Sequence, residues 1–378
     1  MTAHVDVAII GGGPAGASAA LSLARTGLRA LIVERRPQRQ SRAGESLAPS
    51  ATTLLARLGL LPAFLATEPL PCYANRSSWG GDGRLVDYDF IRDPHGHGWH
   101  IDRQRFDQML LDAAVAAGAG LQCGALLASP ERRDGSPWLL KVQADGVVSR
   151  VEADFVIEAS GRRAAFARRI GVHRTHLDRL VAAAAFLVPE SRPGQDSTTL
   201  VEAVPEGWWY SALLRDGRLA AAFMTDPDLL GGLDARHKAG WLARLESTTH
   251  TRQRAAAVGC RLAGDPMVEA AGTSRLDRIA GEGWVAAGDA AAAYDPLSSH
   301  GIGVAIATGA QAARAAAASL RGDAKAPAEY AARNVAGFQR YLGMWRAYYA
   351  DETRWPDSLF WSRRRPAQSE AAPLPAVI

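Results

Sequence analysis

The fold is decided by a stretch near the start of the chain, residues 5–16, which reads VDVAIIGGGPAG from Val5 to Gly16. Its apolar run predicts a strand, its glycines predict a tight turn, and the alanine-rich residues up to Thr26 predict a helix with Pro14 in the first turn. A second apolar run, residues 28–33, predicts the next strand. This β-α-β beginning predicts an α/β fold built on a parallel sheet.

The glycines of this stretch fit the spacing G-x-G-x-x-G. Gly11 permits the tight turn, Gly13 lets the backbone approach a pyrophosphate, and Gly16 lets the helix pack closely on the strand. Glu34 ends the second strand, where a carboxylate can accept hydrogen bonds from both hydroxyls of an adenosine ribose. The sequence therefore predicts a dinucleotide site. We expect the same site to include Pro14, Ala15 and Arg35.

Composition narrows the possible functions. The 378 residues are 48% hydrophobic and 22% charged, which indicates a globular protein of roughly two domains at about 150 residues each. The basic residues are scattered among 39 acidic ones and form no basic face with interleaved aromatics, so we expect no nucleic-acid partner. The three cysteines lie far apart without metal-type spacing, which predicts no metal site and a reduced, cytoplasmic protein. Residues 301–320 are interrupted by Gln311 and Arg314, so we expect no membrane span.

Strand signals of two kinds alternate along the chain. Buried runs at 154–159 and 283–287 suit the parallel sheet, whereas the turn pairs Asp82-Gly83 and Asp216-Gly217 predict antiparallel hairpins. We therefore expect a discontinuous nucleotide-binding domain, an inserted antiparallel β-sheet substrate domain and a C-terminal helical segment. The expected boundaries are 1–72, 100–175 and 272–325 for the nucleotide-binding domain, 73–99 and 176–271 for the inserted sheet, and 326–378 for the C-terminal helix and tail.

A second glycine turn identifies the nucleotide. Gly288-Asp289 follows a short apolar run, and Asp295-Pro296 and Gly301-Ile302-Gly303 precede a long alanine-rich segment. Here the sequence resembles the flavoprotein superfamily of para-hydroxybenzoate hydroxylase, the flavin-dependent tryptophan halogenases and the geranylgeranyl reductases. The resemblance implies that FAD is the cofactor, with Asp289 at its ribityl or pyrophosphate region. It also implies that residues 296–303 pass beside the isoalloxazine, where a helix start stabilises the negative charge of the reduced ring.

Two further segments match the same superfamily. Residues 102–107 resemble an arginine-headed helix whose arginine, here Arg103, lies close to FAD, and residues 42–46 resemble the segment that crosses the flavin in halogenases and their relatives. Residues 156–162 depart from the phenol hydroxylases, so the electron donor stays open between NAD(P)H and a separate flavin reductase. The cofactor-binding residues that the resemblance implies are Arg42, Ser46, Arg103, Gly288, Asp289, Pro296, Gly301, Ile302 and Gly303.

The reaction is less closely defined than the cofactor. Halogenases carry a Trp-x-Trp-x-Ile-Pro block and a lysine beside the substrate tunnel, whereas this chain has Gly207-Trp208-Trp209-Tyr210 and no lysine before Lys141. The pattern most resembles flavoprotein maturases that hydroxylate tryptophan in quinone-cofactor enzymes. We therefore expect a monooxygenase that hydroxylates an indole or phenol through a flavin C4a-hydroperoxide. Its substrate would be an aromatic small molecule or a tryptophan-containing partner polypeptide. The alternatives are a halogenase of an aromatic substrate and a reductase or dehydrogenase of a prenyl or lipid chain.

Five side chains are candidates for chemistry or substrate binding. His300 directly precedes the glycines expected beside the flavin and has a side chain suited to proton transfer near neutral pH. Glu45 could act on the substrate or hold its own loop. Trp208, Trp209 and Tyr210 could line a flat pocket or could pack inside a strand, and the sequence leaves both open.

Overall fold

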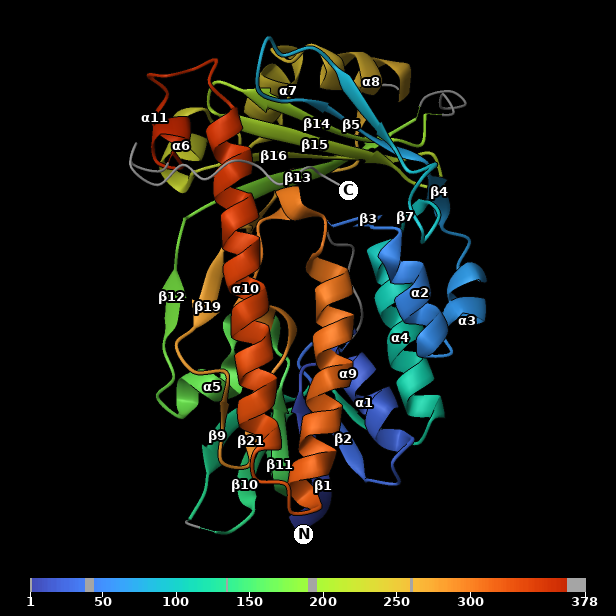
Figure 1. Ribbon diagram of the computed structural model, residues 1–378, viewed down its shortest axis with the longest axis vertical. Coiled ribbons are helices and arrows are strands. Elements are labelled where there is room, and N and C mark those ends of the chain that lie inside the picture. Colours follow the sequence, from blue (N-terminus) through green and yellow to red (C-terminus); the bar gives the residue numbers. More distant parts are fainter. Residues whose placement is uncertain (1, 38–43, 134, 190–195, 259–260, 366–378) are drawn as a thin grey trace.

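Strand β1 (Thr2–Ile10) lies in the interior of an eight-stranded sheet whose central strands are parallel, and its residues Val7, Ala8 and Ile9 have no exposed surface. It pairs in parallel with β11 (Val147–Glu158) on one side and with β2 (Ala30–Glu34) on the other. The computed structural model describes residues 2–37, 44–133, 135–189, 196–258 and 261–365, and Figure 1 shows the arrangement of their helices and strands.

The rest of this sheet comes from distant parts of the chain. Its order is β20-β21-β11-β1-β2-β8, and β10 and β9 extend it from β11. The strands not yet bounded are β8 (Gly120–Cys123), β9 (Leu126–Glu131), β10 (Trp138–Ala144), β20 (Ala280–Gly281) and β21 (Trp284–Ala286). The predicted α/β class with a Rossmann-type parallel sheet is confirmed.

Three helices pack on one face of this sheet: α1 (Pro14–Ala24), α4 (Arg103–Ala116) and α9 (Gly301–Leu320). Their small side chains let them approach closely. A Cβ at Gly309 in α9 would stand 2.1 Å from the carbonyl oxygen of Ala15, so glycine is required where α9 crosses α1. This close crossing brings the beginning of the chain against a helix almost 300 residues later.

The second large sheet has the order β17-β13-β16-β15-β14-β5-β6, with β18 also pairing with β13. Its strands are antiparallel except for the parallel pair β14 and β5. Helices α7 (Lys238–Glu246) and α8 (His250–Val258) cover one face, as Figure 1 shows. Its strands are β5 (Ala74–Ser78), β6 (Val86–Asp89), β13 (Val181–Val188), β14 (Thr199–Val204), β15 (Gly207–Leu213), β16 (Leu219–Thr225), β17 (Arg261–Leu262) and β18 (Met267–Ala270). The exact domain boundaries stay a prediction.

Shorter elements connect the two large sheets. One three-stranded sheet has the order β3-β7-β4 and the other has the order β12-β19-β22. Their bounds are β3 (Ser46–Leu47), β4 (Leu70–Cys72), β7 (Gly98–His100), β12 (Arg174–His176), β19 (Ser274–Leu276) and β22 (Ala292–Ala293). The short helices are α2 (Ser50–Arg57), α3 (Leu61–Leu65), α5 (Ala165–Arg169) and α6 (Pro227–Gly232).

The C-terminal segment joins both halves of the molecule. Helix α10 (Ala326–Asp351) runs from the parallel sheet to the second sheet, where α11 (Leu359–Ser362) follows it (Figure 1). Tyr330 near the start of α10 is buried in the core beside the parallel sheet, whereas Tyr349 near its end is buried with Trp361 against the second sheet. The aromatic residues near the C-terminus therefore belong to the protein core. Within the described residues, no helix combines the length and apolarity that a bilayer span requires.

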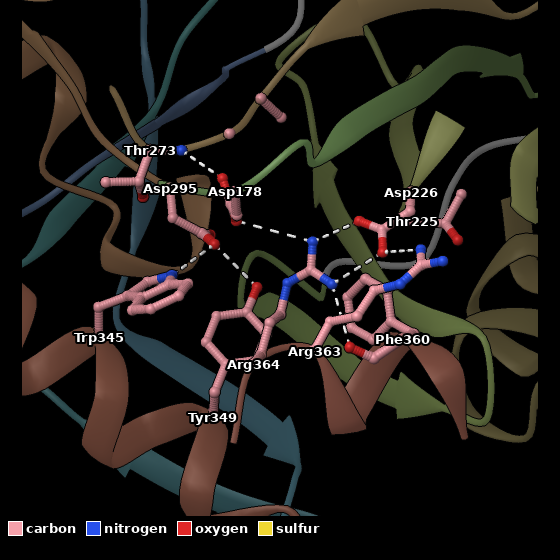
Figure 2. Close-up of polar contacts among 12 residues, drawn as sticks. Asp178, Thr225, Asp226, Thr273, Asp295, Trp345, Tyr349, Phe360, Arg363 and Arg364 are labelled. Atoms are coloured by element: carbon pink, nitrogen blue, oxygen red, sulfur yellow. Dashed lines mark hydrogen bonds and ion pairs between the residues drawn. The ribbon is translucent and has the colours of Figure 1, made fainter. Parts of the chain in front are cut away.

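A group of carboxylates around the buried Arg364, which we call the carboxylate cluster (Asp178, Asp226, Asp295 and Arg364), holds this segment in place (Figure 2); Asp226 and Asp295 are buried, and the side chain of Asp178 is 7% exposed. Arg364 Nη2 lies 2.5 Å from Asp226 Oδ1 and 3.6 Å from Asp178 Oδ2. Asp295 Oδ2 accepts hydrogen bonds from Trp345 Nε1 at 3.0 Å and from the Tyr349 hydroxyl at 2.8 Å. The cluster thus ties α10 and α11 to the second sheet and to the loop before α9.

Candidate functional site

The glycine loop after β1 has the shape that a dinucleotide site needs. Gly11 has φ +105, and a Cβ there would stand 2.5 Å from the carbonyl oxygen of Ala159. A Cβ at Gly16 would stand 1.9 Å from the carbonyl oxygen of Gly11, so α1 packs directly on the turn. A Cβ at Gly13, by contrast, would have no atom of the described residues beyond its chain neighbours within 4 Å. The loop is therefore closed toward the sheet and open at Gly13, which fits a phosphate held at the start of a helix.

Glu34 is fixed beside this loop. Its Oε2 accepts a hydrogen bond from the Gly12 amide at 2.7 Å, and its Oε1 accepts one from the Arg36 amide at 2.8 Å. The buried carboxylate therefore lies at the end of β2, next to the glycine turn, as a ribose-binding acid requires. Most of the Arg35 side chain is exposed. Burial of the remainder, and the positive charge of nearby Arg163, lower the pKa of Arg35. Arg42 lies outside the described residues.

The second glycine turn, Gly288–Ala290, packs against the first helix. A Cβ at Gly288 would stand 2.8 Å from the Cβ of Ala15. Arg174 Nη2 donates hydrogen bonds to the carbonyl oxygens of Asp289 and Ala290, at 2.9 and 2.6 Å. The half-buried Asp289 carboxylate lies 3.7 Å from Arg162 Nε. The turn thus presents an acid beside the glycine loop, where it could bind the polar middle of FAD.

Arg162 and Arg174 hold the Asp289 turn, and neither was among the predicted site residues. Arg162 Nη2 also donates to the carbonyl oxygens of Ala271 and Tyr294. Arg162 belongs to the segment 156–162 that the sequence analysis compared with the family, so that segment was a usable signal. Arg174 stands in no motif, and only the tertiary fold reveals it.

Arg103 begins α4 beneath the segment expected to cross the flavin. Its guanidinium lies 3.1 Å from Asp107 Oδ2, and a Cβ at Gly44 would stand 3.0 Å from its Nη1. Burial lowers the pKa of Arg103, but Asp107, Glu45 and Asp289 together raise it above its usual value. Two predicted cofactor segments, around Gly44 and Asp289, therefore lie near this cation.

Glu45 is buried and its carboxyl group is only half satisfied. Oε2 accepts a hydrogen bond from the Gly44 amide at 3.0 Å, whereas the buried Oε1 has no hydrogen-bond partner within the described residues. Burial raises the pKa of Glu45 to about 7, although the Gly44 amide and Arg103 oppose the shift. A carboxyl group of this kind can hold a proton near neutral pH and has one oxygen free for a ligand.

The loop before α9 places His300 and the glycines together. Pro296–Ser298 form one helical turn after Asp295, whose Oδ1 accepts a hydrogen bond from the Leu297 amide at 2.9 Å. His300 is exposed and directly precedes α9, and its side chain makes no capping hydrogen bond. The half-buried first turn of α9 includes Ile302, and Cβ atoms at Gly301 and Gly303 would have no atom within 4 Å from outside this turn, within the part of the chain that the structure describes. This helix start is therefore open to a ligand.

The three aromatic residues of β15 do not share one environment. Trp209 points to the face covered by α7, where it packs on Phe223 and Trp241. Trp208 points to the opposite face and donates from Nε1 to the Tyr349 hydroxyl at 3.0 Å. The hydroxyl of Tyr210 lies 2.8 Å from Ser46 Oγ, in the segment expected to cross the flavin.

Of the two possibilities left open for these rings, packing inside the protein holds for Trp209, so the three rings do not line one pocket. Successive residues of a strand face opposite sides, so the sequence already contained the signal that separates Trp209 from its neighbours. Tyr210 is the member of this set that contacts the Ser46 segment, while Trp208 packs deeper on the same face.

Comparisons with known proteins identify the family and the fold. The family described as FAD binding domain matches residues 4–208. The FAD-dependent oxidoreductase LodB of Marinomonas mediterranea, named as putative, is 30% identical over 95% of this chain and 96% of its own length. The flavin-dependent halogenase CmlS is 26% identical with a TM-score of 0.85, covering 98% of this chain and 69% of its own. QhpG, a peptidyl tryptophan dihydroxylase essential for tryptophylquinone cofactor biogenesis, is 26% identical with a TM-score of 0.75, covering 96% of this chain and 79% of its own.

Proposed function

This chain belongs to the FAD binding domain family and is an FAD-dependent oxidoreductase, and from that premise we propose that it is a monooxygenase that hydroxylates an electron-rich aromatic ring. The proposed substrate is a tryptophan side chain of a partner polypeptide, or a small indole or phenol. The similarity to QhpG, whose name states that it hydroxylates peptidyl tryptophan, supports this choice of substrate.

The observation on which the proposal depends is the buried carboxyl group of Glu45, whose Oε1 has no hydrogen-bond partner among the described residues and whose pKa is raised by burial to about 7. Bound FAD would supply the activation of molecular oxygen. Residues 11–16, Glu34, Arg103 and Asp289 would hold it. Glu45, whose side chain is shielded from water, would hold or donate a proton at Oε1. The exposed His300 would exchange protons with solvent at the loop before α9.

Hydroxylation and halogenation both use this fold, and the similarity to CmlS favours halogenation as a second candidate. The positions of the three lysines argue against it. Lys141 on β10 pairs with Glu131 at the surface, Lys238 begins α7 on the covered face of the second sheet, and Lys325 directly precedes α10. None of them lies on the elements that carry Glu45, Tyr210 and His300. A halogenase of this chain would have to direct its halogenating species without a lysine on those elements.

Oxygen labelling separates the candidates. FAD-loaded protein is reduced chemically, mixed with isotopically labelled molecular oxygen, and given indole, phenol or a tryptophan-containing peptide, with and without bromide. We expect one labelled oxygen atom in the aromatic product whether or not bromide is present. Bromide-dependent addition of bromine would establish the halogenase instead. Reoxidation with no labelled product, together with reduction of an added prenyl chain, would establish the reductase.

A variant connects the activity to Glu45. We expect Glu45→Gln to bind FAD but to lose most of the hydroxylation, by about 100-fold, which is a typical contribution of one proton-transferring side chain. The exposed Cys123→Ser is the matched control and should retain full activity. Full activity of Glu45→Gln would remove Glu45 from the mechanism. The electron donor, NAD(P)H or a separate flavin reductase, stays a prediction that the same protein can test with each donor in turn.

A further inference from the structure

A chain of buried hydrogen bonds runs from Tyr210 to His100. The Tyr210 hydroxyl lies 2.8 Å from Ser46 Oγ, and Ser46 Oγ lies 3.0 Å from Thr199 Oγ1. Thr199 Oγ1 lies 2.9 Å from His100 Nε2, and His100 Nδ1 lies 2.9 Å from the carbonyl oxygen of Leu213. His100 is 1% exposed and Thr199 is 3% exposed, so the two contacts of His100 are shielded from water, whereas Ser46 and Tyr210 are half-buried. None of the residues beyond Ser46 and Tyr210 was a predicted site residue.

The two ends of this chain determine the direction of every hydrogen bond in it. A carbonyl oxygen can only accept, so His100 Nδ1 carries the hydrogen that it donates to Leu213. Burial, together with Arg254, lowers the pKa of His100 to about 3, so the imidazole is neutral and its Nε2 accepts. Thr199 must therefore donate to His100.

The same reasoning continues toward Tyr210. Because the Thr199 hydrogen is directed at His100, Ser46 must donate to Thr199, and Tyr210 must donate to Ser46. The thiol of Cys72, 3.7 Å from Thr199 Oγ1 and 3.3 Å from the Ala74 carbonyl oxygen, does not change this order, since the threonine hydrogen is already used. The single hydroxyl hydrogen of Tyr210 thus points at Ser46, and the phenol oxygen has only acceptor capacity left.

Tyr210 lies beside the segment expected to cross the flavin. Its hydroxyl contacts Ser46, next to Glu45. Glu45 is also near enough for its charge to raise the pKa of Tyr210, after burial, which is the larger cause. An aromatic ring bound at this segment, beside Glu45, would lie within reach of the Tyr210 oxygen.

We infer that Tyr210 is a specificity-determining residue that accepts a hydrogen bond from the ring N–H or O–H of the aromatic substrate, and that His100 is a positioning residue which sets this polarity through Thr199 and Ser46. The inference rests on the proposed function and identifies the substrate class as aromatic rings with a polar hydrogen. The chain orients hydrogens and does not conduct protons, because its terminal base, neutral His100, is a poor proton acceptor.

The test compares the binding of two rings of the same shape, and it needs no turnover. Indole has a ring N–H, whereas benzofuran has a ring oxygen that can only accept. Dissociation constants of both are measured on FAD-loaded protein by equilibrium dialysis. We expect wild-type protein to bind indole about tenfold more tightly, the ratio that one hydrogen bond and one avoided oxygen–oxygen contact would produce.

Variants along the chain give different ratios. Tyr210→Phe should bring the ratio to about one, because it has no polar atom to offer. Thr199→Val should bring the ratio toward one, because Ser46 no longer has to donate to Thr199 and the Ser46–Tyr210 hydrogen bond can then run in either direction, so that Tyr210 can accept from indole or donate to benzofuran. Thr199→Ser should restore the preference for indole. Cys72→Ala, which leaves all four hydrogen bonds in place, is the matched control and should keep the wild-type ratio.

A wild-type ratio near one, an unchanged ratio in both Tyr210→Phe and Thr199→Val, or no binding of either ring would overturn the inference. Far-ultraviolet circular dichroism and FAD content establish that each variant is folded. If Tyr210→Phe does not fold, Thr199→Val still decides between the outcomes. Failure of hydroxylation with the expected ratios intact would contradict the proposed function and leave this inference standing, since the two experiments read different quantities.

Discussion

The glycine loop at residues 11–16 and the carboxylate cluster around Arg364 each lie where distant segments meet, but different interactions hold the segments together at the two places. The loop depends on the absence of side chains: Gly11 and Gly16 in the loop, and Gly309 of α9 where it crosses α1, let backbone atoms approach more closely than any Cβ would allow. The cluster uses charge: Asp226 and Asp295 are buried with Arg364, which is 3% exposed, and the side chain of Asp178 is 7% exposed (Figure 2).

This difference has consequences for stability. A close backbone contact tolerates no added atom but is insensitive to pH. Buried carboxylates depend on their cation and on protonation, and burial together with the charge of Asp295 raises the pKa of Asp178 to about 6. Asp178 Oδ2 and Arg364 Nε are buried without hydrogen-bond partners within the described residues, so the cluster is incompletely satisfied. We therefore expect the loop to respond to volume and the cluster to respond to charge.

The largest expected effect is at Arg364. Arg364→Met keeps the length of the side chain but removes the cation between the buried carboxylates, and we expect a loss of about 3–5 kcal/mol in the free energy of unfolding. Urea denaturation measures it. Arg363→Met is the matched control, because Arg363 is half exposed and its ion pairs should contribute about 1 kcal/mol or less. Equal losses in the two variants would show that the cluster is not held by its buried cation.

The second effect distinguishes two buried acids by pH. The pKa of Glu45 is raised from 4.5 to about 7 in the folded protein, so the folded state holds this proton more tightly than the unfolded state. The contribution of this group to the free energy of unfolding is at most about 3 kcal/mol. It is fully present below pH 4.5 and is lost as the pH rises to about 7. The stability contributed by Asp178 changes in the same direction and is lost as the pH rises from 3.8 to about 6.

Glu45→Gln and Asp178→Asn separate these two contributions. The difference in unfolding free energy between wild-type protein and each variant, measured by urea denaturation across the pH range, should fall only within the window of the acid replaced. A difference that stays flat with pH for Glu45→Gln would mean that the folded protein does not hold a proton at Glu45.

The third effect tests the close backbone contacts. Gly309→Ala puts a methyl group 2.1 Å from the Ala15 carbonyl oxygen, and we expect a loss of about 1–3 kcal/mol. Gly343→Ala is the same substitution in an exposed, uncrowded turn of α10, where alanine should gain about 0.5–1 kcal/mol from its helix propensity. Thermal unfolding of both variants gives the comparison. A gain for Gly309→Ala would show that α1 and α9 can separate at little cost.

The smallest expected effect on stability is at Gly13. Its φ of −68 suits any residue, and a Cβ there would contact no other part of the described chain within 4 Å, so Gly13→Ala should change the unfolding free energy of FAD-free protein by about 0.5 kcal/mol or less. The added methyl group would occupy the space proposed for the pyrophosphate. We expect FAD affinity to fall by about tenfold or more, measured by titration of FAD-free protein. Unchanged affinity would move the pyrophosphate away from Gly13.

Local patterns were enough to predict the parallel sheet, the helix after the glycine loop and the family. They succeed because the constraints are short in range: the spacing of Gly11, Gly13 and Gly16 and the acid at the end of the next strand lie within one β-α-β unit. The long helix from Gly301 was predicted for the same reason, from its own run of small apolar residues, and α9 confirms it.

Only the tertiary structure decided which side chains meet. His100, Thr199 and Ser46 come from three strands in two sheets, and Arg364 reaches Asp178 across almost the whole second half of the chain. Contacts between such distant residues depend on sheet order and helix packing, which a local pattern does not encode. The direction of donation along the hydroxyl chain depends in addition on burial, since burial keeps His100 neutral. With His100 as an acceptor, the direction of each hydrogen bond fixes the direction of the next one.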